Sequence, residues 1–326
     1  MQLLQLLADG RFHSGEALGQ KLGIGRSAIW KALRQITSAG LELHAVPGKG
    51  YRLAQSIELL DAEKIAQHLS SNAQETLKQL DILSTVDSTN TYLSQNWEQH
   101  KGVCAVLAET QTQGRGRRGK PWVSPLASNL YLSVSWPLDL SPSQLGGLSL
   151  VIALSLRQAL ARFIRSDKLK IKWPNDIYHD GIKLAGVLTE MRGESTGPYR
   201  AIMGFGVNVN MAQTTQVDID QAWTDVQSVI GKAVSRNQIA AALLNQLSLD
   251  IPHYCEHGLA AFAQEWRRWD YLHQQAVVVD ASPRMLSGRA CGIDENGCLL
   301  LETSQGERLS LHSGEVSLRL EKTSNV

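Results

Sequence analysis

A loop rich in glycine and arginine, QTQGRGRRGKPW at residues 111–122, constrains the fold of this chain more than any other segment. The six residues from Gly114 to Gly119 match the G-x-G-x-x-G pattern of dinucleotide-binding Rossmann folds. In those folds the glycines open a helix, so that backbone N–H groups face the pyrophosphate. Pro121 and Pro125 follow too closely for such a helix. The segment therefore argues against a Rossmann site and predicts a flexible loop whose guanidinium groups fold over a bound anion.

The same loop has a plainer interpretation, as a solvated basic segment that touches nucleic acid. The whole chain has 32 basic and 31 acidic residues and a net charge of +1. It therefore has no bulk attraction for phosphate, and any affinity for nucleic acid must come from a local patch.

The chain of 326 residues is long enough for two or three domains. Hydrophobic residues make up 43% and charged residues 19%, which excludes a disordered, collagenous or fibrous protein. The four cysteines form no CxxC pair, as is typical of reduced thiols. The N-terminus lacks the basic region of a signal peptide, and the longest apolar stretch, 145–156, is too short to span a bilayer. We expect a cytoplasmic protein without a membrane segment.

Basic charge is concentrated in the first 60 residues, where seven basic and four acidic side chains give +3, against −2 for the remainder. Leucines predict a first helix that ends at Asp9-Gly10, and Ser14 fits the N-cap of a second helix. A third helix is predicted from about Arg26 to Ala39. The segments LELHAV and YRL on either side of PGKG then predict a β-hairpin. Together these elements indicate a winged helix-turn-helix.

This module is typical of DNA-binding proteins, although three packed helices with solvated charges have the same pattern. We expect the DNA contacts to come from the third helix and the hairpin tip, at Arg26, Ser27, Trp30, Lys31, Arg34 and Lys49.

From about residue 61 the pattern changes to alternating strands with few helices. The strand-like runs are VCAVLAE, NLYLSVSW, KLKIKW, IKLAGVLTEM and YRAIMGFGVNVN, and long helices are expected over 144–164, 235–250 and 259–269. This order predicts an α+β domain with a mixed, mainly antiparallel sheet and helices on one side. The final segment, from AVVVD to VSLRL, predicts a small β-barrel.

A second group of polar residues lies in LKIKWPNDIYHDGIKLAGVLTE, residues 169–190. Pro174, Asn175 and Asp176 form a turn between two strands, and Lys183 lies inside an otherwise apolar strand. An inward Lys183 near Asp176 would provide a cation for a phosphate or carboxylate and a base for a proton. An edge-strand lysine and a turn aspartate explain the same residues, and spacing alone does not decide.

Ser88, Thr89 and Asn90 stand where a strand runs into a helix, and can serve as helix caps or as donors to a polar ligand. His253, Cys255 and His257 have the wrong spacing for a metal site on a helix, so we expect no protein-bound metal. The chain contains none of the serine-hydrolase, P-loop or zincin motifs.

Taken together, these segments resemble bifunctional biotin–protein ligases, the biotin operon repressors. The motifs are FHSGEALGQKLG, VPGKGYRL, DSTN, ETQTQGRGRRGKPWVSP, NLYLS, KWPNDIY, KLAGVLTE, GFGVNVN and GEVSLR, in that order along nearly the whole chain. The resemblance implies a winged helix-turn-helix at 1–60, a ligase domain of class II synthetase type at 61–270 and an SH3-like barrel at 271–326.

The resemblance further implies that biotin and ATP, carrying Mg²⁺ on its phosphates, give biotinyl-5′-AMP, and that a lysine of the biotin carboxyl carrier protein of acetyl-CoA carboxylase then takes the biotin. Lys183, Arg115 and Asp176 are the expected catalytic residues. The implied ligand contacts are Ser88, Thr89, Asn90, Gln111, Arg115, Gly116, Arg117, Trp122, Asn175, Lys183, Gly186, Asn208, Met211 and Trp223.

Regulation is implied as well. The adenylate would favour a homodimer that binds operator DNA and represses the biotin operon. Two alternatives remain at this point: a lipoate-type ligase of related fold, and a non-enzymatic repressor that senses a small ligand.

Overall fold

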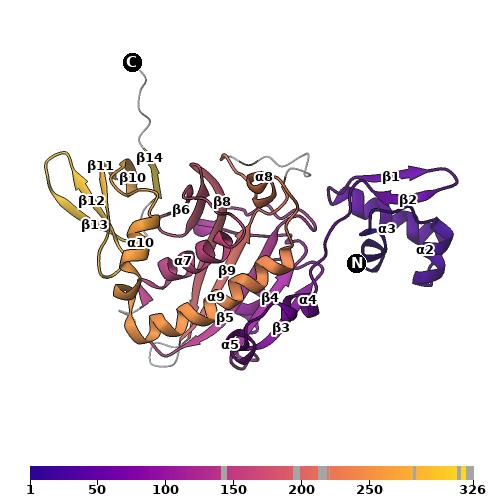
Figure 1. Ribbon diagram of the computed structural model, residues 1–326, viewed down its shortest axis with the longest axis horizontal. Coiled ribbons are helices and arrows are strands. Elements are labelled where there is room, and N and C mark those ends of the chain that lie inside the picture. The colour runs from indigo at the N-terminus through magenta and orange to yellow at the C-terminus, as the bar shows by residue number, and fades with distance from the viewer. Residues whose placement is uncertain are drawn as a thin grey trace, which may run out of the picture.

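The computed structural model describes residues 1–140, 145–193, 199–211, 219, 221–281, 284–313 and 317–320, without the side chains of Ser317 and Arg319. The chain forms three parts along its long axis: an N-terminal helical lobe at one end, a central sheet covered by helices, and a C-terminal sheet at the other end (Figure 1). Within the described residues, no helix is both long and apolar enough to cross a membrane.

The N-terminal lobe contains α1 (Gln2–Leu7), α2 (Gly15–Leu22), α3 (Arg26–Ser38) and the antiparallel hairpin β1 (Leu43–Val46) and β2 (Gly50–Leu53). The expected helices and hairpin are confirmed. The Ser14 hydroxyl caps α2 by accepting a hydrogen bond from Ala17 N, and Gly23 ends that helix with φ of +65°. Ile29, Leu33 and Ile36 point inward from α3 and pack on the leucines of α1 and α2.

The central domain is built on a seven-stranded sheet. Its strand order is β3 (Leu77–Leu83), β4 (Val103–Ala108), β5 (Leu130–Leu138), β9 (Tyr199–Val207), β8 (Ile182–Arg192), β7 (Asp176–His179) and β6 (Leu169–Lys172). Only the pair β3–β4 among these strands is parallel, which confirms a mixed and mainly antiparallel sheet. The pattern of apolar residues in the sequence did not predict β3 or β7. The turn between β6 and β7 contains a cis Trp173–Pro174 peptide.

Two long helices, α7 (Leu148–Ala161) and α9 (Arg236–His257), cover one face of this sheet (Figure 1). Helix α7 is apolar on nearly all sides, so it is buried along its length. Helix α9 extends seven residues beyond its predicted end, through Pro252. The predicted start of the first helix, Gln144, lies outside the described residues.

Our expectation that the helices lie on one side of the sheet is wrong for α6 (Thr89–Gln95). Leu93 of α6 packs with Cys104, Val106 and Ile202, which alternate with the residues beneath α7 and α9 and therefore face the opposite way. The smaller helices are α4 (Ala62–Gln67), α5 (Ser71–Thr76), α8 (Val226–Ile230) and α10 (Ala263–Trp269), with short 3-10 turns at Arg117–Gly119 and Leu259–Phe262.

The C-terminal domain is an antiparallel sheet in the order β13 (Arg308–Leu311), β12 (Leu299–Thr303), β11 (Arg284–Ile293), β10 (Ala276–Ala281) and β14 (Ser317–Leu320). The Trp173 indole N–H, just before Pro174, donates 3.1 Å to the Gly297 carbonyl and joins this sheet to the central domain. Of the motif GEVSLR, residues 314–316 lie outside the described part of the chain.

Candidate active site

A row of glycines leaves one area of the central sheet without side chains. Gly186 of β8 pairs with Gly206 of β9, and Gly204 pairs with Leu188 in the next row. The Trp122 ring lies directly on Gly206, where an added Cβ would come within 2.4 Å of the indole. The Asn90 side chain lies in the same way on Gly204, at 2.2 Å from an added Cβ. Any larger residue at Gly204 or Gly206 would therefore displace Asn90 or Trp122.

A buried polar cluster surrounds the start of α6, beside these glycines. The Ser88 hydroxyl accepts a hydrogen bond from Thr91 N and so caps the N-terminus of α6. Capping was one of the two roles expected for it. The Thr89 amide and hydroxyl both donate to the Gln111 amide oxygen, at 2.9 and 3.1 Å. The Ser133 hydroxyl lies 2.7 Å from the Thr89 hydroxyl and 2.6 Å from the Asn90 amide oxygen. These groups are preorganised donors and acceptors for a neutral polar ligand.

Lys183 and Asp176, whose proximity the sequence left open, form an ion pair with 2.8 Å between Nζ and Oδ2. The Lys183 side chain is 14% exposed and that of Asp176 25%. The Lys183 ammonium also lies 5.5 Å from the centre of the Trp122 ring, a cation–π distance. Gly186 lies against both Lys183 and Asp176, since a Cβ added to this glycine would lie 3.1 Å from Asp176 Oδ1. The pair thus lies at the edge of the glycine row.

The arginine loop crosses this area as an irregular turn and not as a helix. Gly116 N donates to the Lys120 carbonyl at 2.7 Å, and Arg118 adopts a left-handed conformation. The Arg115 guanidinium pairs with Glu190, 3.2 Å away. Arg117 donates to the Ser313 carbonyl of the C-terminal domain. Burial lowers the pKa of Arg117, and the nearby Asp176 carboxylate opposes that shift.

Four of the expected ligand residues are held by hydrogen bonds or backbone contacts within the protein. Asn175 donates to the Val187 carbonyl, and Asn208 donates to the Thr224 carbonyl at 3.1 Å. Met211 is 1% exposed, and its amide donates to Asp225. Trp223 bridges to the backbone of Lys183. Of the four, Trp223 lies beside Lys183. Residues 212–218 lie outside the described structure.

The sequence interpretation missed Ser133, Glu190 and Lys172. Glu190 accepts a hydrogen bond from the Asn90 amide at 3.0 Å while it pairs with Arg115, and so joins the polar cluster to the loop. Burial lowers the pKa of Lys172, and the Asp176 carboxylate acts in the opposite direction. Of these three residues, only Ser133 could have been found from the sequence, because it is a polar residue that alternates with apolar ones in β5. Its side chain lies on the face of the sheet that bears the glycines of β9.

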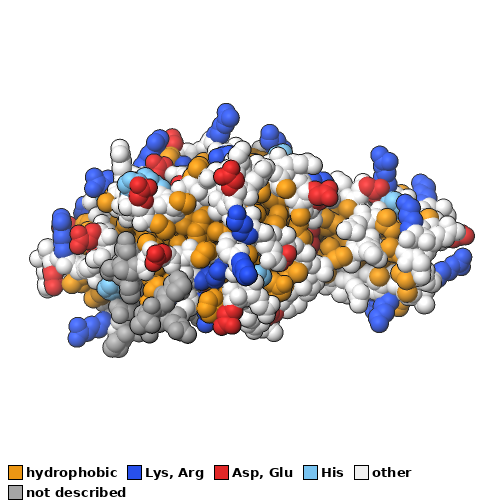
Figure 2. Space-filling model, turned by 90° about the horizontal axis from the view of Figure 1, so that it is seen from below, with side chains coloured by type: hydrophobic (Ala, Val, Ile, Leu, Met, Phe, Trp, Pro, Cys, Tyr) orange, Lys and Arg blue, Asp and Glu red, His pale blue; other side chains and the backbone are white. Residues whose placement is uncertain are grey.

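The six side chains expected to contact DNA are all exposed on the N-terminal lobe, where Figure 2 shows basic side chains projecting outward. Trp30 is 56% exposed, and the Arg34 guanidinium lies 4.8 Å from its ring. Lys49 lies at the hairpin tip, 6.0 Å from the Phe12 ring. A cavity of about 550 Å³ separates the start of α3 from the hairpin. The exposed basic side chains of α3 and the hairpin tip lie on either side of this cavity, and we refer to them together as the basic surface.

No group of three or more metal-binding side chains occurs within the described residues. His253 and His257 stack with ring centres 4.4 Å apart, next to Phe262. All four cysteines are free thiols.

Comparisons with known proteins agree with this arrangement. Residues 82–208 match the Biotin/lipoate A/B protein ligase family, residues 1–52 an HTH domain, and residues 277–319 the Biotin protein ligase C terminal domain. The chain is 38% identical to the Bifunctional ligase/repressor BirA of Salmonella typhimurium and 37% identical to that of Escherichia coli, covering 98% of this chain and 97% of each relative.

Among solved structures, a biotin protein ligase from Aquifex aeolicus in complex with biotin and ATP superposes with a TM-score of 0.64 at 30% identity, over 75% of this chain and all of that one. Because the likeness to the two bacterial relatives extends over nearly the full length of both chains, this chain belongs to the family of bifunctional biotin–protein ligases and repressors.

Proposed function

We propose that this biotin ligase forms biotinyl-5′-AMP on the glycine row of β8 and β9 and then transfers biotin to a lysine of a carrier protein. The observation that carries the proposal is the Lys183–Asp176 pair, held at 2.8 Å beside Trp122 and Gly186. In the first step an oxygen of the biotin carboxylate attacks the α-phosphorus of ATP, and pyrophosphate leaves. Two anions must meet in this step, so cationic side chains lower its barrier.

Lys183, Arg115 and Arg117 are the cations in the proposed mechanism. Lys183 exchanges its contact with Asp176 for the carboxylate and phosphate oxygens of the ligand. Arg115 leaves Glu190, and Arg117 leaves the Ser313 carbonyl, when the loop folds over the adenylate. Closure of Gly114–Trp122 excludes water from the mixed anhydride.

The polar cluster at α6 positions the uncharged part of biotin. Ser88, Thr89, Asn90 and Gln111 are the contacts we propose there, because a network of buried hydroxyl and amide groups suits a neutral polar ring. Gly116, Trp122 and Gly186 would line the same pocket. Asn175, Asn208, Met211 and Trp223 would act through the backbone that they hold.

Asp176 is the proposed base of the second step. The acceptor amine attacks the acyl carbon, AMP leaves, and the amine proton passes to Asp176. This carboxylate is available as a base once Lys183 has turned toward the ligand phosphate.

Mg²⁺ would enter on the phosphates of ATP. The two carboxylates of the site, Asp176 and Glu190, are engaged by Lys183 and Arg115, which leaves no pair of free carboxylates there among the described residues.

We further propose that 1–60 is a winged helix-turn-helix, 61–270 the ligase domain and 271–326 an SH3-like domain in a cytoplasmic protein. Binding of biotinyl-5′-AMP would favour a homodimer whose two basic surfaces contact two half-sites of operator DNA. The acceptor would be the biotin carboxyl carrier protein of acetyl-CoA carboxylase, since relatives of this chain are named biotin–[acetyl-CoA-carboxylase] ligases.

The test is transfer of labelled biotin to a carrier domain in the presence of MgATP, with release of pyrophosphate measured in parallel. Label on the acceptor lysine is the expected result, and its absence would refute the enzyme mechanism. Octanoate and lipoate in the same assay test the lipoate alternative, which predicts transfer of those acids. Pyrophosphate release that is equal in wild type and Lys183→Ala would favour the non-enzymatic repressor.

A further inference from the structure

Arg236, at the first turn of α9, is a buried cation that the ligation mechanism does not use. It is 3% exposed, and its guanidinium pairs with Glu109 at 2.8 Å, where the carboxylate is also buried. The guanidinium donates to the carbonyl of Asn129 at 3.1 Å and to that of Glu58. A buried arginine with all its contacts on three different segments fixes those segments relative to one another.

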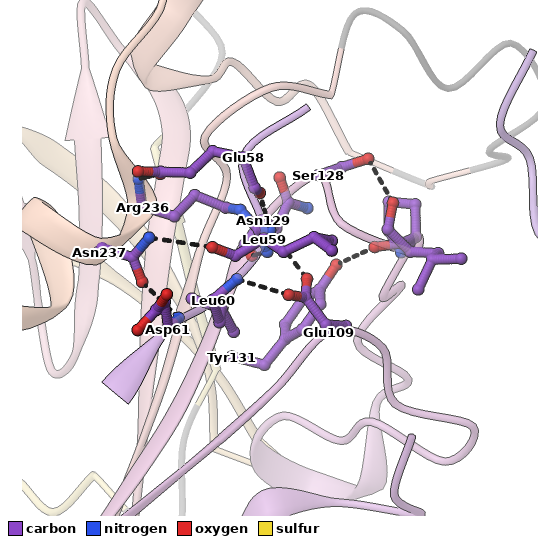
Figure 3. A network of polar contacts seen from close by, with 12 residues as sticks. Glu58, Leu59, Leu60, Asp61, Glu109, Ser128, Asn129, Tyr131, Arg236 and Asn237 are labelled. Carbon is purple, nitrogen blue, oxygen red and sulfur yellow. Dashed lines mark hydrogen bonds and ion pairs between the residues drawn. The ribbon is translucent and has the colours of Figure 1, made fainter. Parts of the chain in front are cut away.

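One of these segments, Glu58–Asp61, joins the N-terminal lobe to the central domain, and Figure 3 shows it enclosed by Arg236, Asn237 and Glu109. The Glu58 carboxylate accepts from the Arg236 amide and the Ser235 hydroxyl, both at 2.7 Å. Leu60 N donates to Glu109 at 2.6 Å, and Asp61 N to Asn237 at 2.9 Å. All four residues of the linker are therefore hydrogen-bonded to the central domain, and the linker cannot act as a free tether.

Asn129 directly precedes β5, whose Tyr131 pairs with Gly206 of the glycine row. Asn129 is fully buried, and its amide oxygen accepts from Val209 N at 2.9 Å. Its amide nitrogen lies 2.8 Å from the Met211 sulfur, and Met211 N donates to the Asp225 cap of α8. Val209 and Met211 follow the end of β9, the strand that carries Gly204 and Gly206. One arginine thus holds both the linker and the strand end beside the site.

We propose that Arg236 is a positioning residue that couples the DNA-reading lobe to the end of β9 beside the glycine row within one protomer, by holding Glu58–Asp61, Asn129 and the pair Val209 and Met211 as one unit. Adenylate bound beside Val209 and Met211 restrains that already packed end of the unit further, and the linker end is restrained with it. By reciprocity, loosening the linker weakens the adenylate. This inference rests on the proposed function, because its ligand is the adenylate of that site.

The experiment uses the full chain and a non-hydrolysable sulfamoyl analogue of biotinyl-5′-AMP. Glu58→Gln removes the carboxylate charge by which the linker segment Glu58–Asp61 is bound to Ser235 and the Arg236 amide. Glu63→Gln, at an exposed position of α4, is the matched control. We expect Glu58→Gln to bind the analogue about fivefold more weakly, and Glu63→Gln to bind it as wild type does. The KM for biotin should rise by a similar factor while kcat stays within about twofold.

Two further measurements separate coupling from a general loss of stability. In an Arg236→Lys background, Glu58→Gln should weaken analogue binding by less than about twofold, because the connection is already broken. Hydrogen exchange at the Leu60 and Asp61 amides should slow when the analogue binds wild type, and should not change in Arg236→Lys.

Equal analogue affinity in wild type and Glu58→Gln, or a lowered melting temperature with unchanged affinity, would overturn the coupling. Failure of the wild-type chain to transfer biotin would instead overturn the proposed function. A chain that ligates biotin but shows no linker effect would leave the function standing and remove only this inference.

Discussion

The N-terminal lobe and the central domain place their charges in opposite ways. In the lobe, Arg26, Lys31 and Arg34 face solvent above a core of leucine and isoleucine. In the central domain, three arginines are nearly inaccessible, at 7% for Arg157, 9% for Arg200 and 3% for Arg236.

The two arrangements need different amounts of surrounding structure. An exposed arginine on α3 needs only the helix that carries it. Arg200 needs the Ser135 hydroxyl and the His100 carbonyl, 65 and 100 residues away in the chain. Surface charges can therefore act on a partner directly, whereas these three buried arginines are already engaged and can act only through the segments that they hold. The following predictions test this contrast, beginning with the largest expected effect.

Lys183→Ala should reduce ligation about a thousandfold, because the pair with Asp176 and the cation for the phosphate are lost together. Initial rates of biotin transfer measure the effect. Lys168→Ala is the matched control, since that lysine pairs with Asp180 while 61% exposed. A Lys183→Ala enzyme with more than about a tenth of the wild-type rate would contradict the role given to this side chain.

Leu18→Ala should destabilise the lobe by about 3 kcal/mol, because Leu18 is completely buried in its small core. Hydrogen exchange should increase at α2 and α3 and remain unchanged at β5 and β9. Leu22→Ala, on the same helix but only half-buried, should have a smaller effect. Increased exchange in the central sheet as well would show that the two regions do not unfold separately.

Asp270→Asn should stabilise the folded chain by about 2 kcal/mol at pH 7. Burial raises the pKa of Asp270 from 3.8 to about 6, an effect that the hydrogen bond from Leu272 and the nearby His273 and Lys170 reduce. Below pH 4 the carboxyl is protonated in both the folded and the unfolded state. Between pH 4 and 6 the carboxyl ionises freely in the unfolded state but stays protonated in the folded state, so the free energy of unfolding falls; above pH 6 the folded state carries the buried charge and the loss is complete.

The asparagine variant should therefore lack this decrease in the free energy of unfolding between pH 4 and 6, as denaturant titrations would show. Asp180→Asn is the contrasting variant. Its exposed carboxyl has a lowered pKa because of Lys168, so its removal should not stabilise the chain at pH 7. An unchanged pH profile in Asp270→Asn would mean that another group controls it.

Arg34→Ala should weaken binding to a DNA duplex selected from a random library by about tenfold, and lower the salt slope by about one. Fluorescence anisotropy across a series of salt concentrations measures both quantities. Lys64→Ala, exposed on α4 outside the lobe, should change neither. Unaltered binding by Arg34→Ala would mean that the basic surface of α3 does not face the DNA.

The same contrast explains what could be predicted from the sequence. Helices α2 and α3 and the hairpin follow from spacing within a few residues, and all were confirmed. The Lys183–Asp176 pair could be suggested but not decided, because it depends on the register of β7 against β8. Ser133 and Glu190 meet at Asn90 only because β5, β9 and β8 lie side by side. Contacts of this kind depend on the order of strands in the sheet, and the spacing of residues along the sequence does not determine that order.

The bare glycine row of β8 and β9 also limits how this site can be redesigned. Because Trp122 and Asn90 rest against Gly206 and Gly204 without intervening atoms, no substitution can make the floor of the pocket deeper. If biotin binds on this row as we propose, a variant that accepts a bulkier analogue must therefore gain its space from the opposite side, by shortening Trp122 or lengthening the arginine loop. The floor would then stay constant among engineered variants while the opposite side differs between them.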